Sequence, residues 1–369
     1  MIAQFRFLAL ALLIVALAGC GTAPTQTPST DAPTTAPAAE AAAATDAPAA
    51  GGATTGSSTI TLGAYTTPRE AYAQIIPLFT AQWKEQTGQE LTFEESYLGS
   101  GAQSRAIVEG FDADVAALSL EADITRIADA GLITHDWKSI NNGGMVSTSV
   151  VVFAVRKGNP KGIKDWADLA KDGVEVLTPN PKTSGGAQWN IMALYGAAIR
   201  GKVEGVSAND ETAAIEFMKT VLKNVSVMDK GARESITNFE NGVGDVAITY
   251  ENEVLVAQKA GQEMDMVIPT SSILIENPVA LVDTYVDKHG NRQAVEAFIK
   301  FLYTAEAQTI FAENGLRSID PAVADATADR YPPLQDLFTI KEFGGWSQVT
   351  PKFFGDTGIY SNAIAEVQQ

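Results

Sequence analysis

Short β-rich runs alternate with amphipathic stretches along the chain from residue 58 onward. The run 59–62 is typical of a strand, and Pro68 then opens a helix in which apolar residues recur at spacings of three and four. The apolar face of that helix is formed by Tyr72, Ile76, Phe79 and Trp83. Further predicted strands and helices alternate in the same way, at 91–93, 100–110, 113–118 and 123–132. Strands that alternate with helices predict an α/β fold with a mostly parallel sheet.

A continuous β-branched and apolar run at 150–155 predicts a strand that is buried on both faces. We expect this strand to carry the chain into a second lobe, and the chain to return to the first lobe near 267–282. The predicted division places 58–149 and 273–369 in lobe I and 150–272 in lobe II.

The N-terminal segment has the composition of a targeting and tethering region. An apolar run at 7–18 is shorter than the roughly 20 residues of a membrane-spanning helix and ends in small residues, as secretory signals do. Leu17-Ala18-Gly19-Cys20 resembles the bacterial lipobox, in which the cysteine is lipidated and becomes the new N-terminus. We therefore expect a signal peptide at 1–20 and a lipid anchor on Cys20. Residues 21–57 are almost all Ala, Thr, Pro, Gly and Ser, which predicts a disordered tether.

Charge and motif content argue against several classes of function. A net charge of −18 argues against nucleic-acid binding, which needs a basic face. Because Cys20 is the one cysteine, the mature protein is expected to have no disulfide and no thiol chemistry. His135 and His289 stand in no catalytic or metal-binding motif, and neither Gly-x-Ser-x-Gly nor His-Glu-x-x-His occurs. We expect no enzymatic activity, no cofactor and no metal site.

Three predicted helix starts are led by small residues, at Gly99–Ala102, Thr183–Ala187 and Lys230–Arg233. A helix start has free backbone N–H groups and a partial positive charge, and glycine lets an anion approach that backbone closely. Each start alone fits an ordinary helix cap as well. Three of them at the carboxyl ends of strands, where open α/β sheets bind ligands, predict an anion site.

The second of these turns lies within Asn180-Pro181-Lys182-Thr183-Ser184-Gly185-Gly186-Ala187. Five further motifs accompany it, at Trp83–Gly88, Val155–Pro160, Gly242–Val246, Glu251–Glu253 and Phe343–Trp346. Together they closely resemble the periplasmic sulfate-binding proteins of ABC importers over essentially the whole folded region. The resemblance implies a type II periplasmic-binding-protein fold with an α/β sheet in each lobe. It also implies sulfate or thiosulfate as the ligand, buried in the cleft between the lobes.

The resemblance carries individual binding residues over to this sequence. The implied ligand-binding residues are Thr66, Ser100, Ser184, Gly185, Gly186, Ala232 and Tyr250. Thr66 stands where the family usually has aspartate, and Tyr250 stands where it often has tryptophan, so that a tyrosine hydroxyl would donate in place of an indole N–H and from a different distance. The cations nearest in sequence to the three turns, Lys182 and Arg233, are expected to act as flanking, partly screened charges.

A site made only of donors suits sulfate, which is fully deprotonated at neutral pH and only accepts hydrogen bonds. Phosphate keeps a proton, which would be left facing another donor at a penalty of about 1–3 kcal/mol. The alternatives are a receptor for thiosulfate, molybdate or phosphate, a receptor for an organic solute, and a secreted hydrolase. The expected partners are ABC permease subunits and, through the lipid anchor, the membrane. We expect an extracytoplasmic, monomeric protein.

Overall fold

The computed structural model describes residues 58–331 and 333–368. The predicted signal peptide, Cys20 and the tether therefore lie outside the described residues. Within these residues the strands are β1 (Ser58–Tyr65), β2 (Leu91–Leu98), β3 (Val115–Ala117), β4 (Met145–Arg156), β5 (Val176–Leu177), β6 (Val225–Val227), β7 (Val246–Tyr250), β8 (Met264–Val267), β9 (Ser271–Leu281) and β10 (Asp336–Phe338).

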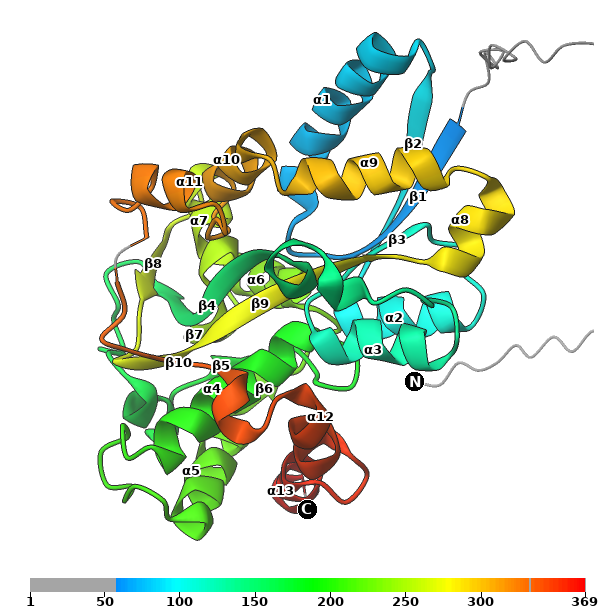
Figure 1. Ribbon diagram of the computed structural model, residues 1–369. Coiled ribbons are helices and arrows are strands. Elements are labelled where there is room, and N and C mark those ends of the chain that lie inside the picture. Colours follow the sequence, from blue (N-terminus) through cyan, green and yellow to red (C-terminus); the bar gives the residue numbers. More distant parts are fainter. Residues whose placement is uncertain (1–57, 332, 369) are drawn as a thin grey trace, which may run out of the picture. The chain divides into compact units, whose positions relative to one another are not determined.

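The helices of the described residues follow the strands in alternation over most of the chain (Figure 1). They are α1 (Arg69–Thr87), α2 (Ser100–Val108), α3 (Glu121–Asp129), α4 (Gly185–Ile199), α5 (Glu211–Lys223), α6 (Ala232–Glu240), α7 (Glu251–Lys259), α8 (Asp283–His289), α9 (Arg292–Leu302), α10 (Ala305–Glu313), α11 (Pro321–Ala326), α12 (Trp346–Val349) and α13 (Ile359–Val367). Shorter helical turns are η1 (Trp137–Ser139), η2 (Asn141–Gly144), η3 (Trp166–Ala170), η4 (Ile340–Phe343) and η5 (Thr350–Phe354).

The strands join in the order β2-β1-β3-β9-β4-β7-β5-β6, with β10 beside β9 and β8 beside β4. The strands of lobe I, β1, β2 and β3, pair in parallel, and β5 pairs in parallel with both β6 and β7 in lobe II. This confirms the predicted α/β class with a mostly parallel sheet in each lobe. Strands β4 and β9 are antiparallel to each other, β9 is antiparallel to β3, and β4 is antiparallel to β7 and β8, whereas β10 pairs with β9 in parallel, so the whole sheet is mixed.

Two long strands, β4 and β9, carry the chain between the lobes. One end of β9 pairs with β3 in lobe I, and its middle pairs with β4. The second half of β4 pairs with β7 and β8 in lobe II. Residues 150–155 of β4 are at most 1% exposed, which confirms the predicted buried strand. Because these two paired strands span the junction, they are a natural place for a hinge.

The core of lobe I contains the predicted apolar face of α1. Tyr72, Phe79 and Trp83 are buried, and the ring of Phe79 lies 5.2 Å from that of Phe298 on α9. In lobe II the core is built around α4, which is buried along nearly its whole length beneath β9 and β7. Each lobe therefore has its own packed core, and the lobes meet along the carboxyl ends of their parallel strands.

The C-terminal segment lies with lobe II, whereas the sequence placed all of 273–369 in lobe I. Strand β10 pairs with the lobe II end of β9, and this pairing places Phe338 of β10 against α4. There the Phe338 ring lies so close to Gly196 that a Cβ atom on the glycine would be 2.4 Å from it. The rings of Trp346 and Trp189 pack edge to face at 4.7 Å. Residues 336–367 therefore complete the core of lobe II.

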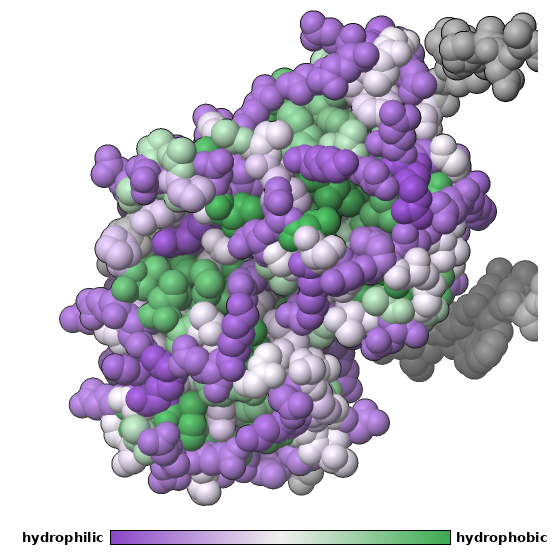
Figure 2. All heavy atoms as spheres, viewed as in Figure 1, coloured by the Kyte–Doolittle hydropathy of each residue, from purple (hydrophilic) through white to green (hydrophobic). Residues whose placement is uncertain are grey.

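Hydrophilic side chains prevail over the face of the molecule seen in Figure 2, with apolar residues visible in the recesses between them. The large apolar side chains that are exposed stand apart in the sequence, at Leu98, Val108, Val243 and Leu337. None of the helices in residues 58–331 and 333–368 is long and apolar enough to cross a membrane.

Candidate functional site

The three glycine-led turns form helix starts, as the sequence predicts. Ser100 is the first residue of α2, Gly185 of α4 and Ala232 of α6. The Ser184 hydroxyl accepts a hydrogen bond from the Ala187 N–H at 3.3 Å and so caps α4. The caps of α2 and α6 are glycines, which have no side chain to occupy the first N–H groups. At α2 the Ala102 N–H donates to another backbone, and the N–H groups of the first residues of α2 and α6 remain available as donors.

The three helix starts meet at the junction of the lobes. The carbonyl oxygen of Thr183 accepts a hydrogen bond from the Ala102 N–H at 3.2 Å, and the Thr183 hydroxyl donates to the carbonyl oxygen of Lys230 at 2.8 Å. A Cβ atom on Gly99 would lie 2.6 Å from the Thr183 oxygen and 2.8 Å from the Lys230 oxygen. Glycine is therefore required at position 99 for this close approach of three backbones.

Most of the predicted lobe II residues lie in direct contact with one another. A Cβ atom on Gly186 would be 2.7 Å from Cε2 of Tyr250, 3.4 Å from the Ser184 hydroxyl oxygen and 3.5 Å from Cβ of Ala232. All four residues are buried. Gly186 thus leaves its backbone open at the centre of this group.

The predicted lobe I residues face the same group. Thr66 lies just after β1, and its hydroxyl oxygen would be 3.7 Å from a Cβ atom on Gly231, the cap of α6. Ser100 connects to the group through Ser119, whose N–H donates to the Ser100 hydroxyl at 3.0 Å. We call the seven predicted residues and Ser119 the donor cluster; the structure brings all of them together.

Ser119 is a residue that the sequence analysis missed. Its hydroxyl oxygen lies 2.6 Å from the phenol oxygen of Tyr250, and a Cβ atom on Gly185 would lie 2.6 Å from that same hydroxyl. The signal that indicates it is its place directly after the predicted strand 113–118, at a ligand-binding edge of the sheet. It stands in no recognisable motif.

Besides the Ser184 cap, further hydroxyl groups of the donor cluster have partners in this structure. The Ser100 hydroxyl donates to Asp123 at 2.6 Å, so its proton is directed to a carboxylate of lobe I. The Tyr250 phenol shares a hydrogen bond with Ser119. Burial raises the pKa of Tyr250, so the phenol stays neutral and keeps a proton to donate.

Further side-chain contacts besides the donor cluster join the lobes, and two of them adjoin it. The Trp189 indole N–H donates to the carbonyl oxygen of Ser119 at 2.9 Å. Arg233 on α6 bonds Glu70 on α1 at 2.9 Å and Glu253 on α7 at 2.6 Å. The sequence predicts Arg233 as a screened flanking charge, but its side chain is 26% exposed and its guanidinium is held by two carboxylates.

The charges of this ion-pair network influence one another. Burial opposes the charged form of Arg233, but Glu253 and Glu70 raise its pKa. Although burial pulls the other way, the hydrogen bond from Arg233 lowers the pKa of Glu70. Burial raises the pKa of Glu253, against the opposing effect of Arg233. The network therefore fixes Arg233 as an inter-lobe tie, distinct from the donors.

Both histidines are paired with aspartates, a relationship that the sequence did not indicate. His135 Nδ1 lies 2.7 Å from Asp283, and His289 Nδ1 lies 2.8 Å from Asp114. Each aspartate also accepts a backbone N–H, from Thr134 and Thr61 respectively, so these pairs tie loops and strands of lobe I together. No group of three metal-binding side chains occurs in the part of the chain that the structure describes.

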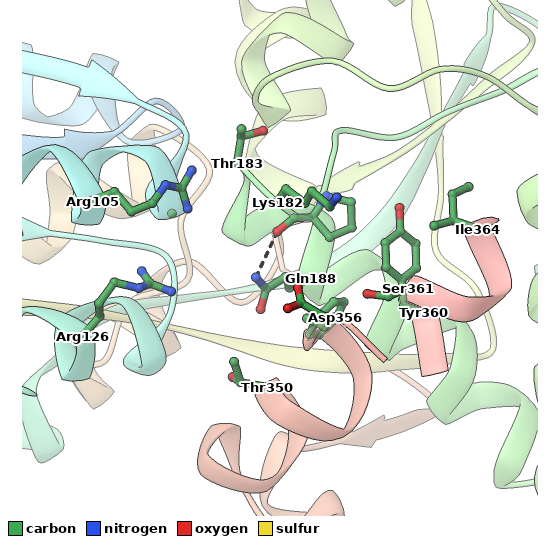
Figure 3. A pocket seen from close by; sticks show the side chains of 13 residues that line it. Arg105, Arg126, Lys182, Thr183, Gln188, Thr350, Asp356, Tyr360, Ser361 and Ile364 are labelled. Carbon is green, nitrogen blue, oxygen red and sulfur yellow. Dashed lines mark hydrogen bonds between the residues drawn. The ribbon is translucent and has the colours of Figure 1, made fainter. Parts of the chain in front are cut away.

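A cavity of about 610 Å³ lies beside the donor cluster (Figure 3). Gly101 and Thr183, which adjoin Ser100 and Ser184 of the cluster, line it together with Arg105, Arg126 and Lys182. The donor cluster itself lies beyond this lining.

The known proteins that this chain resembles agree with one another in kind. A family model described as bacterial extracellular solute-binding protein matches residues 60–317. A sulfate-binding protein of Synechococcus elongatus is 48% identical over 301 residues, which cover 81% of this chain and 84% of the relative. A thiosulfate-binding protein of Pseudomonas aeruginosa is 39% identical over 303 residues, covering 80% of this chain and 89% of the relative.

A solved structure supports the same grouping. The sulfate-binding protein SubI from Mycobacterium tuberculosis superposes with a TM-score of 0.74 at 39% sequence identity. The match covers 80% of this chain and 99% of that structure.

Proposed function

The chain belongs to the family of bacterial extracellular solute-binding proteins, and from that premise we propose that it captures sulfate outside the cytoplasm and delivers it to an ABC importer. The observation that carries the proposal is the convergence of three helix starts on Gly186, Ser184 and Ala232 at the junction of the lobes. The proposed ligand-binding residues are Thr66, Ser100, Ser184, Gly185, Gly186, Ala232 and Tyr250.

The chemistry of the donor cluster supports a fully deprotonated oxyanion. Its groups are backbone N–H donors at helix starts and neutral hydroxyls, and Gly185 and Gly186 leave the backbone open to close approach. Fixed N–H dipoles stabilise a dianion without a neighbouring cation. A protonated anion such as phosphate would place its O–H against a donor, which disfavours it.

The junction strands support capture by closure of the two lobes. We propose that β4 and β9 act as the hinge, and that Trp189, Tyr250 and Arg233 make their inter-lobe contacts when the cleft closes. The closed form would then dock on the permease. The protein would act as a monomeric carrier with no chemistry of its own, as expected of a solute-binding protein.

Thiosulfate is the second candidate ligand. It has the same charge as sulfate and is likewise only an acceptor, and a thiosulfate-binding relative is 39% identical to this chain. Thiosulfate has a terminal sulfur atom in place of one oxygen of sulfate, and sulfur is larger than oxygen. The space within the donor cluster would therefore decide which of the two ions binds more tightly.

A lipid anchor on Cys20 would hold the protein at the outer face of a membrane, with 21–57 as the tether. Fractionation of cells that express the wild-type chain and Cys20→Ser tests this part. The wild type should sediment with membranes and the variant should be released. A wild-type protein free of the membrane fraction would contradict the anchor.

Thermal unfolding tests sulfate binding itself. A ligand that binds only the folded state stabilises it by about 2.7 kcal/mol at 100 times its dissociation constant. The melting temperature of ligand-free protein should therefore rise with sulfate concentration. An unchanged melting curve in millimolar sulfate would contradict the proposal.

A further inference from the structure

The cavity beside the donor cluster is cationic on both of its sides. Arg105 on α2 and Arg126 on α3 line it from lobe I, and Lys182, just before α4, lines it from lobe II (Figure 3). Asp356, near the start of α13, is the acidic residue of the lining. The lining therefore has an excess of positive charge in a chain whose net charge is −18.

Two of these cations have no partner among the residues that the structure describes. Arg126 donates to Asp123 at 2.6 Å and to the Ser104 hydroxyl at 2.9 Å. Within residues 58–331 and 333–368, the guanidinium of Arg105 and the ammonium of Lys182 make no hydrogen bond or ion pair with another side chain or with the backbone. With 44 acidic residues in the chain against 26 cations, a lack of carboxylates does not explain this. An anion from solution is the missing partner that the two charges can share.

A thin seam separates the cavity from the donor cluster. It is the hydrogen bond from the Ala102 N–H to the Thr183 oxygen, at 3.2 Å, with Gly99 packed beside it. Gly101 and Thr183 line the cavity on one side of the seam, and their neighbours Ser100 and Ser184 belong to the cluster on the other. Because the seam joins lobe I to lobe II, opening of the lobes would break it and connect the two spaces.

We propose that this cavity is an encounter site for the doubly charged oxyanion, at which Arg105 and Lys182 hold the ion before it passes to the donor cluster. This inference rests on the proposed function. The surrounding protein repels a dianion at long range, and a local pair of cations in a recess raises the ion concentration at the mouth of the cleft. The two charges affect the rate at which the ion associates and not the rate at which it dissociates, because the closed seam separates them from the bound ion.

Stopped-flow measurement of sulfate binding to the purified protein tests the proposal, with tryptophan fluorescence as the signal. Trp189 is a suitable reporter because its indole bridges the lobes to Ser119. Wild type, Arg105→Gln, Lys182→Gln and the double variant are compared over a range of ionic strength. Lys223→Gln is the matched control, since Lys223 on α5 is exposed and lies outside the cavity lining.

We expect the association rate constant to fall about threefold or more in each single variant at low ionic strength, and further in the double variant. The difference should shrink as salt screens the charges, while the dissociation rate and the control remain as in wild type. Unchanged melting temperatures would show that the variants are folded.

Two results would overturn the encounter site alone, provided that the wild-type protein binds sulfate. One is an association rate constant in the Arg105 and Lys182 variants equal to that of the wild type and the control. The other is a change in the variants that is confined to the dissociation rate. Absence of sulfate binding by the wild-type protein in calorimetry would instead overturn the proposed function, and the encounter site with it.

Discussion

The phenol oxygen of Tyr250 lies 2.6 Å from the hydroxyl oxygen of Ser119. Tyr250 ends β7 in lobe II and Ser119 follows β3 in lobe I, so this hydrogen bond crosses the junction at the donor cluster. Two hydroxyl groups have two protons, and one suffices for the bond between them. The second proton is free for a bound ion, and the pair can therefore close the lobes and bind the ligand at once.

Tyr250→Phe tests whether the phenol donates to the ion. We expect a loss of about 1.5–3 kcal/mol in sulfate binding free energy, the value of a hydrogen bond to a charged group. If the phenol only bridges to Ser119, Ser119→Ala should cause the same loss and the double variant no more. A full additional loss for Tyr250→Phe in the Ser119→Ala background, measured by calorimetry, would show a direct contact with the ion.

Substitutions at the start of α4 should separate steric exclusion from loss of a donor. A Cβ atom on Gly185 would lie 2.6 Å from the Ser119 hydroxyl and 2.9 Å from Cγ of Leu120, so even Gly185→Ala should hinder closure. Gly185→Asp adds a negative charge and should abolish detectable binding. Ser184→Ala should weaken binding by about 1.5–3 kcal/mol through loss of one hydrogen bond.

Ala73→Asp on the exposed side of α1 is the control for the added charge and should bind as wild type does. Retained binding in Gly185→Asp would contradict an ion held at this helix start.

Arg233→Gln should destabilise the folded protein more than it weakens ligand binding. Loss of one partner of a buried ion pair costs about 3–5 kcal/mol, and the low end applies because the Arg233 side chain is 26% exposed. The Glu253 side chain, which is 1% exposed, would be left buried without its cation. Chemical unfolding of the variant measures the loss, with Arg69→Gln, whose guanidinium stacks on Tyr97, as the control for lost charge.

The loss in Arg233→Gln should depend on pH. Burial raises the pKa of Glu253 in the folded state, so its protonated form is favoured there and stability falls as pH rises through that pKa. Removal of Arg233 raises the pKa of Glu253 further, because Arg233 opposes the effect of burial. The deficit should therefore be larger at pH 8 than at pH 5, and a deficit that is equal at both would show that Glu253 is not the group left unpaired.

The sequence predicts those parts of the fold that depend on local patterns. The apolar face of α1, the buried strand at 150–155 and the three helix starts follow from spacing, β-branched content and glycine placement, and the structure contains all of them. The partnership of Arg233 with Glu70 spans 163 residues and has no periodic signal. Ser119 likewise acquires its role only where β3 and β7 are brought together across the junction.

The C-terminal segment shows the same limit. Its local sequence pattern does not indicate which lobe covers it. The choice depends on the parallel pairing of β10 with β9 and on the space that Gly196 leaves for Phe338. Such complementarity between distant residues is a property of the packed structure.

Isothermal titration of the purified, ligand-free protein with sulfate, thiosulfate, molybdate and phosphate tests the central claim most directly. The account predicts one sulfate per chain and, for phosphate, an affinity about tenfold or more weaker, since its proton would face a donor in the cluster. Phosphate binding as tight as sulfate binding, or no heat with sulfate at millimolar concentration, would contradict a donor-only site for a fully deprotonated oxyanion.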